Sequence, residues 1–161
     1  MTLRRLPAFA LAALLAAPAA AQDASDASFL GTCLSVQLPG GTATVEARCV
    51  GIIAASCMNG PDGKGLDGQA RCLDREAVAW TAVMEAACAD LSDRAARKAE
   101  SSAAALAGAQ TAWAAFARAE CGYAHALWGA EPFAEVASAD CRLNTVARRA
   151  IQLRAQIGPE G

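Results

Sequence analysis

The residues of this chain with the most chemistry to offer are seven cysteines and a single histidine. No two cysteines are spaced as CxxC, which argues against a thioredoxin-like redox site, and no CxxCH sequence is present to attach a c-type haem. His125 follows Cys121 by four residues, a helical spacing that suits a Cys–His pair or half of a metal site. A histidine on a helix surface is far commoner, so we expect no metal and no cofactor. The cysteines are Cys33, Cys49, Cys57, Cys72, Cys88, Cys121 and Cys141.

The other polar residues do not form a catalytic set. The sequence lacks G-x-S-x-G, Walker and HExxH motifs, and the stretch 62–65 lacks the alternating oxygen ligands of a calcium loop. Glu120 and Asp140 each precede a cysteine, and we expect them to cap or solvate helix ends. The sequence therefore predicts that the protein is not an enzyme. Four arginines are expected to form one solvated helix face, namely Arg142, Arg148, Arg149 and Arg154.

The first 21 residues have the composition of a secretory signal peptide. Arg4 and Arg5 precede an apolar run over 6–17, and a small-residue cleavage site of the A-x-A kind ends at Ala21. This segment is too short to span a membrane. We therefore expect a periplasmic or secreted mature protein, residues 22–161, that forms a single domain without a transmembrane segment.

Export has two consequences for the mature chain. An oxidising compartment makes disulfides the expected state of the cysteines. Cleavage also removes two arginines and leaves 12 basic against 16 acidic residues, a net charge near −4. That balance excludes a nucleic-acid-binding protein and favours, weakly, a basic protein partner.

The elements that must position these residues are predicted to be helices. Alanine supplies 44 of the 161 residues, and alanine favours helix but buries little surface. Apolar residues recur with a helical period, which predicts an all-α fold, a small antiparallel bundle of about five helices. The expected helices cover about 27–37, 43–57, 67–97, 102–128 and 137–156.

Two local expectations follow from this assignment. The glycine-rich stretch 59–65 is expected to be the loosest part of the chain. The fourth helix is expected to present an apolar face made of Leu106, Ala109, Trp113, Phe116, Cys121 or Ala117, Ala124 and Leu127 or Trp128.

The cysteines can be paired between neighbouring helices. Cys33 with Cys49, Cys57 with Cys72, and Cys121 with Cys141 would each close a short loop, and each bridge would contribute about 2–4 kcal/mol. This choice is one of 15 pairings that six cysteines allow. It leaves Cys88 as the free thiol. Either Cys88 is a buried small hydrophobic residue of a monomer, or it forms an intermolecular bridge in a dimer.

Three segments, 57–80, 109–121 and 141–153, carry a set of motifs in a specific order and spacing. Together they resemble the LprI-like family of exported lysozyme inhibitors, over about residues 49–155. The resemblance implies a small, helical, disulfide-stapled domain. The residues that carry it are Leu73, Asp74, Arg75, Glu76, Trp80, Gln110, Trp113, Glu120, Arg149 and Leu153.

Five polar positions of the family pattern have changed in this chain. Thr81 stands at an Asp position, Glu85 at Asn, Cys88 at Tyr, Ala117 at Arg and Val146 at Thr. Buried polar groups must be satisfied together or removed together. We therefore interpret the five positions as a hydrogen-bonded set between helices that this protein has replaced.

Two functions remain open at this stage. The resemblance implies a binding protein that occludes the cleft of a lysozyme-type muramidase. The loop 59–67 is the candidate contact, with Asp62, Lys64 and Asp67 facing the partner, if a bridge from Cys57 to Cys72 pins its ends. A plain connection between helices is the simpler interpretation of this loop. The alternative function is an envelope-associated structural or interaction module of the same fold without lysozyme inhibition.

Overall fold

The computed structural model describes residues 17–157 of the chain, and within them it contains helices and no strand. The predicted all-α fold class is therefore confirmed. Two short 3-10 helices, Leu38–Gly40 and Pro61–Gly63, join longer elements. The α-helices are α1 (Ala17–Gln37), α2 (Thr42–Cys49), α3 (Ile52–Asn59), α4 (Gly65–Lys98), α5 (Glu100–Ala126) and α6 (Ala134–Ile157).

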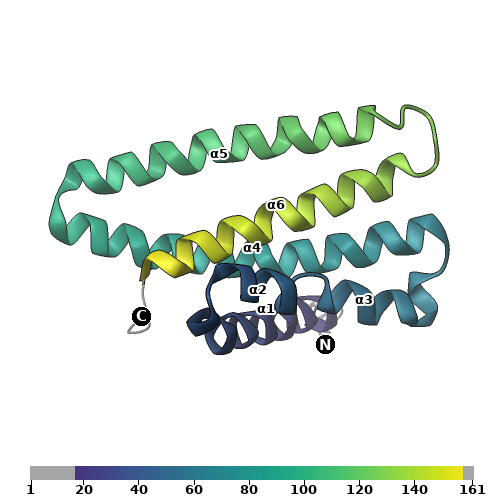
Figure 1. Ribbon diagram of the computed structural model, residues 1–161, viewed down its shortest axis with the longest axis horizontal. Coiled ribbons are helices and arrows are strands. Elements are labelled where there is room, and N and C mark those ends of the chain that lie inside the picture. The colour runs from purple at the N-terminus through teal and green to yellow at the C-terminus, as the bar shows by residue number, and fades with distance from the viewer. Residues whose placement is uncertain (1–16, 158–161) are drawn as a thin grey trace, which may run out of the picture.

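The three longest helices, α4, α5 and α6, run back and forth along the long axis of the molecule (Figure 1). α6 packs most extensively against α4, and α1 to α3 cover the side of this pair that is turned away from α5. The core lies between α1, α4 and α6, because these helices supply the large side chains that are fully buried. Among these side chains are Leu30, Leu34, Trp80, Leu143 and Leu153.

The helix expected over 43–57 is interrupted, so that α2 and α3 are separate elements. Val50 is extended and Gly51 adopts a φ of 87°, a left-handed conformation that favours glycine. Glu76, which is fully buried on α4, accepts hydrogen bonds from the backbone N–H groups of Gly51 and Ala54 at 2.7 and 2.8 Å. It also accepts one from Trp80 Nε1 at 3.0 Å. A buried carboxylate thus caps the start of α3, where the helix dipole favours negative charge.

The glycine-rich connection between α3 and α4 is compact, contrary to the expectation that it is the loosest part of the chain. The 3-10 helix Pro61–Gly63 fills it, and Gly63 is buried against the backbone of Met58. Gly68 also lies close to the backbone of this connection, since a Cβ atom at Gly68 would stand 2.7 Å from the carbonyl oxygen of Asp62. Close approach of backbone to backbone explains the glycines better than flexibility does.

The three predicted disulfides are present in the structure. Cys33 is joined to Cys49, Cys57 to Cys72, and Cys121 to Cys141. Each bridge links two helices that follow one another closely in the chain. The remaining cysteine, Cys88, is a free thiol on α4, half-buried against the core.

The predicted signal peptide lies mostly outside the described residues, which begin at position 17. α1 starts earlier than the residue 27 expected, and the predicted cleavage site after Ala21 falls within it. None of the helices between residues 17 and 157 has the length and apolar character needed to cross a membrane.

Candidate functional site

Arg142 and Arg148 of α6 are exposed, as expected for a solvated face, whereas Arg149 and Arg154 are half-buried, and the arginines of this face also link helices. The Arg142 guanidinium donates to both carboxylate oxygens of Asp74 on α4, at 2.8 and 2.9 Å, and to Ser138 Oγ at 2.7 Å. Arg148 Nε donates to Glu46 Oε1 on α2 at 2.7 Å. These side chains reach α4 and α2 because α6 lies beside both helices. Charged residues on the surface of α6 thus link it to its neighbours.

Arg149 forms the corresponding link between α6 and α5. Its Nε donates to Gln110 Oε1 at 2.6 Å, and its guanidinium lies 6.0 Å from the ring centroid of Trp113. All three residues belong to the family motif. Their arrangement gives them a structural role, since a hydrogen bond and a cation–π contact position α5 against the bundle.

The other motif residues divide between core, cap and surface. Leu73 and Leu153 are buried in the core. Arg75 donates to both oxygens of Asp26 at 2.6 and 2.9 Å, and this hydrogen bonding raises the pKa of the guanidinium above its ordinary value. Glu120 is exposed on α5. The motif therefore encodes mainly the packing of the bundle.

The predicted partner residues lie at one end of the bundle, in the connection between α3 and α4. Asp62, Lys64 and Asp67 are all exposed. The Cys57–Cys72 disulfide closes the base of this connection, and the glycine packing described above rigidifies it. We call residues 61–67 the tip.

A second group of exposed residues was missed by the sequence analysis. Leu127 is 64% exposed and Trp128 is 45% exposed, although the helical pattern had assigned them to a buried face. That assignment was wrong because α5 ends at Ala126, so both side chains lie in the connection to α6. Trp128 and Phe133 contact each other edge to face, with ring centroids 4.6 Å apart. The sequence does contain a signal for this exposed group, because aromatic residues flank Gly129 and Pro132, which end helices.

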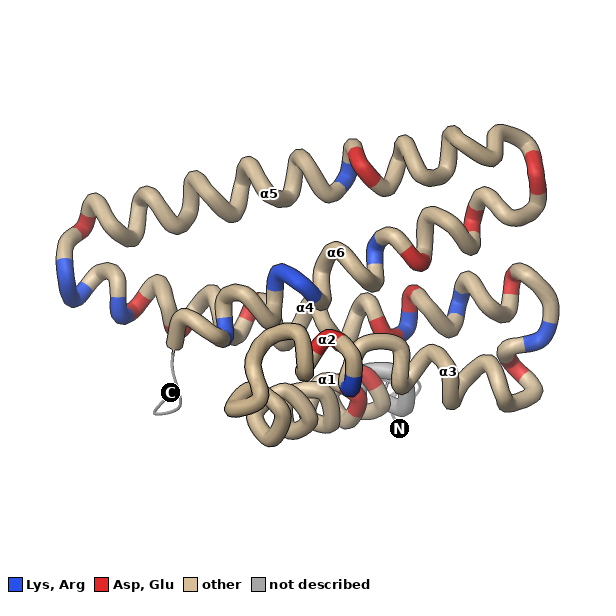
Figure 2. Tube along the Cα trace, viewed as in Figure 1, with Lys and Arg blue, Asp and Glu red and all other residues tan. Residues whose placement is uncertain are grey.

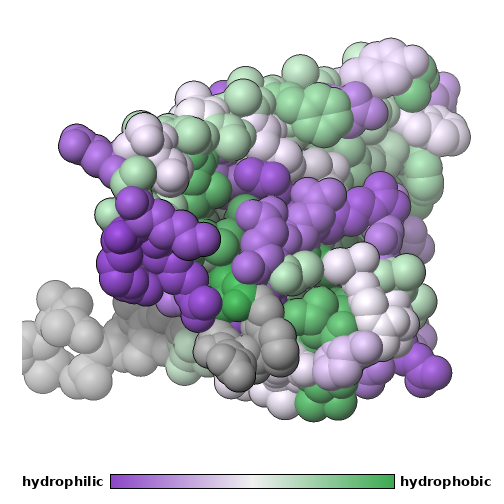
Figure 3. All heavy atoms as spheres, turned by 60° about the vertical axis from the view of Figure 1, so that its left-hand side comes forward, coloured by the Kyte–Doolittle hydropathy of each residue, from purple (hydrophilic) through white to green (hydrophobic). Residues whose placement is uncertain are grey.

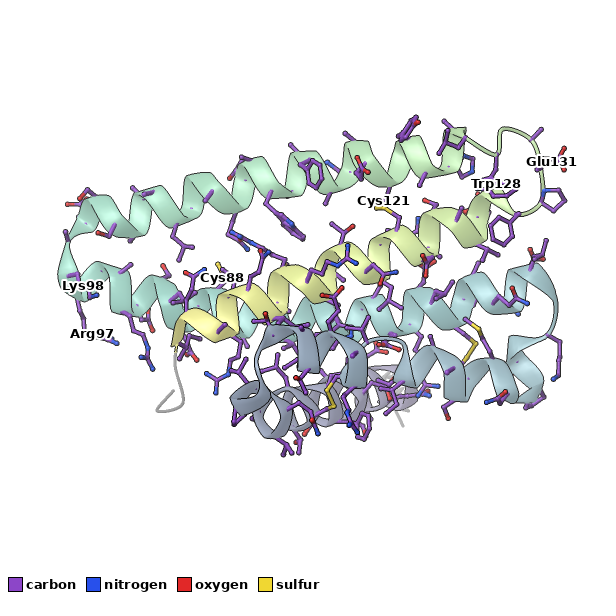
Figure 4. The ribbon with its side chains drawn as sticks, in the orientation of Figure 1. Cys88, Arg97, Lys98, Cys121, Trp128 and Glu131 are labelled. Atoms are coloured by element: carbon purple, nitrogen blue, oxygen red, sulfur yellow. A yellow bond between two sulfur atoms is a disulfide. The ribbon has the colours of Figure 1, made fainter. Side chains whose placement is uncertain are left out.

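The tip and this aromatic connection lie at the same end of the molecule. Figure 1 shows both the α3–α4 and the α5–α6 connections at the end of the long axis opposite the α4–α5 turn. Figure 4 shows Trp128 and Glu131 there, far from Arg97 and Lys98 at the other end. We call residues 61–67 and 127–133 together the end face. It combines exposed charges of both signs with exposed aromatic rings.

A groove of about 1000 Å³ separates α5 from α4 and α6. Three of the five positions at which the chain departs from the family pattern line it, namely Thr81, Ala117 and Val146. Glu85 is exposed on α4, and Cys88 is half-buried on the same helix. The three lining residues come from α4, α5 and α6 and face one groove. A set of residues that once formed hydrogen bonds between helices would need this arrangement.

His125 does not pair with a cysteine. Its Nε2 lies 3.1 Å from Glu135 Oε1, and both side chains are largely exposed. Cys121 is engaged in its disulfide, so it presents no thiolate to a base. Among residues 17–157, no cluster of three or more His, Cys, Asp or Glu side chains is arranged to hold a metal ion.

Comparison with known proteins gives one finding. The family model described as lysozyme inhibitor LprI matches residues 57–153. This range contains α4, α5, most of α6 and both connections of the end face. No curated protein and no solved structure matches the chain.

Proposed function

Since the chain belongs to the LprI family of lysozyme inhibitors, we propose that it is an exported inhibitor of a lysozyme-type muramidase and that the end face is its contact surface. The observation that carries the proposal is the family match over 57–153, which contains the whole end face. Residues 1–21 would direct export, and the mature chain 22–161 would act in the periplasm or outside the cell.

The chemistry of the target explains why the end face suits this role. Muramidases of the lysozyme type hydrolyse glycans with two carboxyl groups in a cleft. The ammonium group of Lys64 would pair with a cleft carboxylate. Trp128 and Phe133 would occupy the subsites that sugars otherwise fill, since exposed aromatic residues are typical anchors of protein interfaces. Asp62 and Asp67 would meet basic groups at the rim.

Rigidity of the end face favours binding. The disulfide at the base of the tip and the buried Gly63 fix the backbone before the partner arrives. A surface that is already ordered loses less conformational entropy on association. The net charge near −4 of the mature chain would also accelerate its encounter with a cationic muramidase.

Lysis of peptidoglycan by several lysozymes, with and without the purified mature chain, tests the proposal. We expect protection at stoichiometric concentrations for at least one lysozyme type. Replacing Asp62, Lys64 and Asp67 together by Ala is expected to raise the half-inhibitory concentration at least about tenfold, a loss of about 1.4 kcal/mol. The matched control removes the same charges at the opposite end of α4, in the triple variant Asp90→Ala, Asp93→Ala and Lys98→Ala.

The aromatic part of the end face has its own variant. Trp128→Ala is expected to weaken inhibition by a similar factor, because truncating an interface anchor typically costs more than 1 kcal/mol. Phe116→Ala, which truncates an exposed aromatic residue in the middle of α5, is the control. Protection that survives both end-face variants would reject the end face as the contact surface but would retain the proposal that the protein is an inhibitor. An absence of protection at large molar excess against every lysozyme would reject the inhibitor and favour the envelope-associated module.

A further inference from the structure

The groove between α5 and the α4–α6 pair has an apolar body. Val78 and Met84 of α4, Trp113 of α5 and Val146 of α6 line it. Val78 is 52% exposed, an unusual position for a valine in a bundle with so few large apolar residues. The volume of about 1000 Å³ lies at the upper end of the range of about 300–1000 Å³ that ligand sites occupy.

Contacts between α5 and α6 lie on both sides of the groove. Towards the α5–α6 connection, the Cys121–Cys141 disulfide and a hydrogen bond from Ser138 Oγ to the Cys121 carbonyl fix α5 on α6. About three turns earlier along α5, Arg149 contacts Gln110. These contacts fix α5 on α6 at two places along the groove.

Between Trp113 and Arg118, the side chains that α5 turns into the groove are short. Ala114 and Ala117 line the groove from α5, and an alanine extends by one methyl group only. Over the whole of α5, which the structure describes completely, Cys121 is the one buried residue. α5 therefore fills the groove only in part.

One end of the groove is polar and cationic. Arg118 and Arg142 line it there, together with Asp74 and Ser138. Arg142 is neutralised by its paired hydrogen bonds with Asp74. Arg118 is exposed and has no hydrogen bond or ion pair with any residue in the described part of the chain. One guanidinium is thus left at the polar end to meet an anion.

We propose that this groove binds a single-chain anionic amphiphile, a free fatty acid, with its carboxylate on Arg118 and its acyl chain along Met84, Trp113 and Val146. A planar guanidinium pairs with a carboxylate through two parallel hydrogen bonds. The apolar body accepts a flexible chain without needing hydrogen bonds from it. A ligand of this shape matches both the charge at one end and the hydrocarbon surface beyond it. This site is separate from the end face and does not rest on inhibition.

Trp113 provides a reporter inside the groove. The chain has three tryptophans, of which Trp80 is fully buried in the core and Trp128 is at the end face. In a Trp128→Phe background, a change in fluorescence on adding sodium dodecanoate, below its micelle concentration, reports binding at Trp113. We expect affinity to rise about threefold to fourfold for each methylene group from octanoate to dodecanoate.

Two comparison ligands separate the contribution of the carboxylate charge from that of the hydrocarbon chain. Dodecanol has the same chain and no charge, and dodecyltrimethylammonium has the opposite charge. We expect dodecanoate to bind at least about tenfold more tightly than either. Arg118→Gln should reduce dodecanoate affinity to that of dodecanol and leave dodecanol unchanged. Equal binding of dodecanol and dodecanoate to the unmodified protein would overturn the assignment of Arg118.

Matched variants of α5 test whether the ligand occupies the groove. Ala117→Leu places a larger side chain in the groove and is expected to abolish binding of dodecanoate. Ala115→Leu adds the same volume at an exposed position outside the groove and is expected to leave binding intact. Circular dichroism checks that both variants fold. Dodecanoate binding that persists in Ala117→Leu, or an absence of binding to the unmodified protein, would overturn the proposal.

Discussion

α6 and α5 are neighbouring helices of similar length and high alanine content, yet they are packed in opposite ways. α6 buries apolar residues along its whole length, from Val136 to Ile157. α5 buries Cys121 alone. A buried helix would be expected to carry fewer charged residues than an exposed one. Figure 2 shows the opposite, because the buried α6 carries several charged residues and most of the exposed α5 carries none. Figure 3 shows mainly pale and green surface along the top of the molecule, where α5 runs.

The difference teaches that lack of charge does not make a helix a core helix. Residues 101–117 contain no charged residue, but their side chains are mostly Ala, Gly and Ser, which have little apolar area to bury. α6 alternates leucine, valine and isoleucine with arginines that reach across to other helices. Large side chains on one face, and long polar ones on the other, let α6 hold the bundle together.

Different contacts hold the two regions. The core region depends on Glu76, whose carboxylate accepts from two buried donors, of Ala54 and Trp80, and from the part-buried N–H of Gly51. α5 depends on the Cys121–Cys141 disulfide, on the hydrogen bonds of Arg149 and Ser138, and on the partial burial of Leu106 and Trp113. Loss of the Glu76 contacts is expected to destabilise the whole fold. Loss of the α5 contacts is expected to loosen α5 alone.

The largest effect is expected from Glu76→Ala. It leaves the buried N–H groups of Ala54 and Trp80 and the part-buried N–H of Gly51 without an acceptor. A buried unpaired group costs about 1–3 kcal/mol, so we expect the free energy of unfolding to fall by at least about 3 kcal/mol. Urea denaturation followed by circular dichroism measures this. Glu76→Gln, which keeps the shape and one acceptor oxygen, should lose less. A Glu76→Ala protein within about 1 kcal/mol of the unmodified one would show that the core region does not depend on this carboxylate.

Removal of the α5 disulfide sharpens the comparison. Replacing Cys121 and Cys141 by Ser is expected to cost about 3 kcal/mol, since the bridge closes a loop with a sequence separation of 20 residues. Hydrogen exchange should also accelerate in α5 more than in α4. The control replaces Cys57 and Cys72, which close a loop of similar length, 15 residues. If both double variants accelerate α5 equally, α5 is not a separately tethered element.

The smallest effect is expected on the outer side of α5. Phe116→Ser and Tyr123→Ser alter side chains that are 57% and 60% exposed, and we expect the free energy of unfolding to change by less than about 0.5 kcal/mol each. Leu143→Ala, at a position of α6 that is 2% exposed, should cost about 2–5 kcal/mol. Thermal and urea unfolding of the three variants give the contrast. Comparable losses at Tyr123 and Leu143 would mean that α5 is packed as firmly as α6.

The sequence was sufficient for the helices and the disulfides because both depend on short-range patterns. Helical period identified α4 and α6 to within a few residues, and the short connections between helices favoured the pairing of the cysteines that flank them. The same logic failed for residues 43–57 and for Leu127 and Trp128. A helical pattern marks which side chains share a face, but not where a glycine turns left-handed or where a helix ends.

By itself, the sequence determined an all-α chain and its likeness to the LprI family and favoured the three bridges, because composition, spacing and period are properties of the chain. Only the tertiary structure decided that Glu76 is a cap, that Arg142, Arg148 and Arg149 link helices, and that α5 stands over an open groove. Each of these depends on which helix lies opposite a side chain, and that is settled by how large and small side chains fit together when the helices pack.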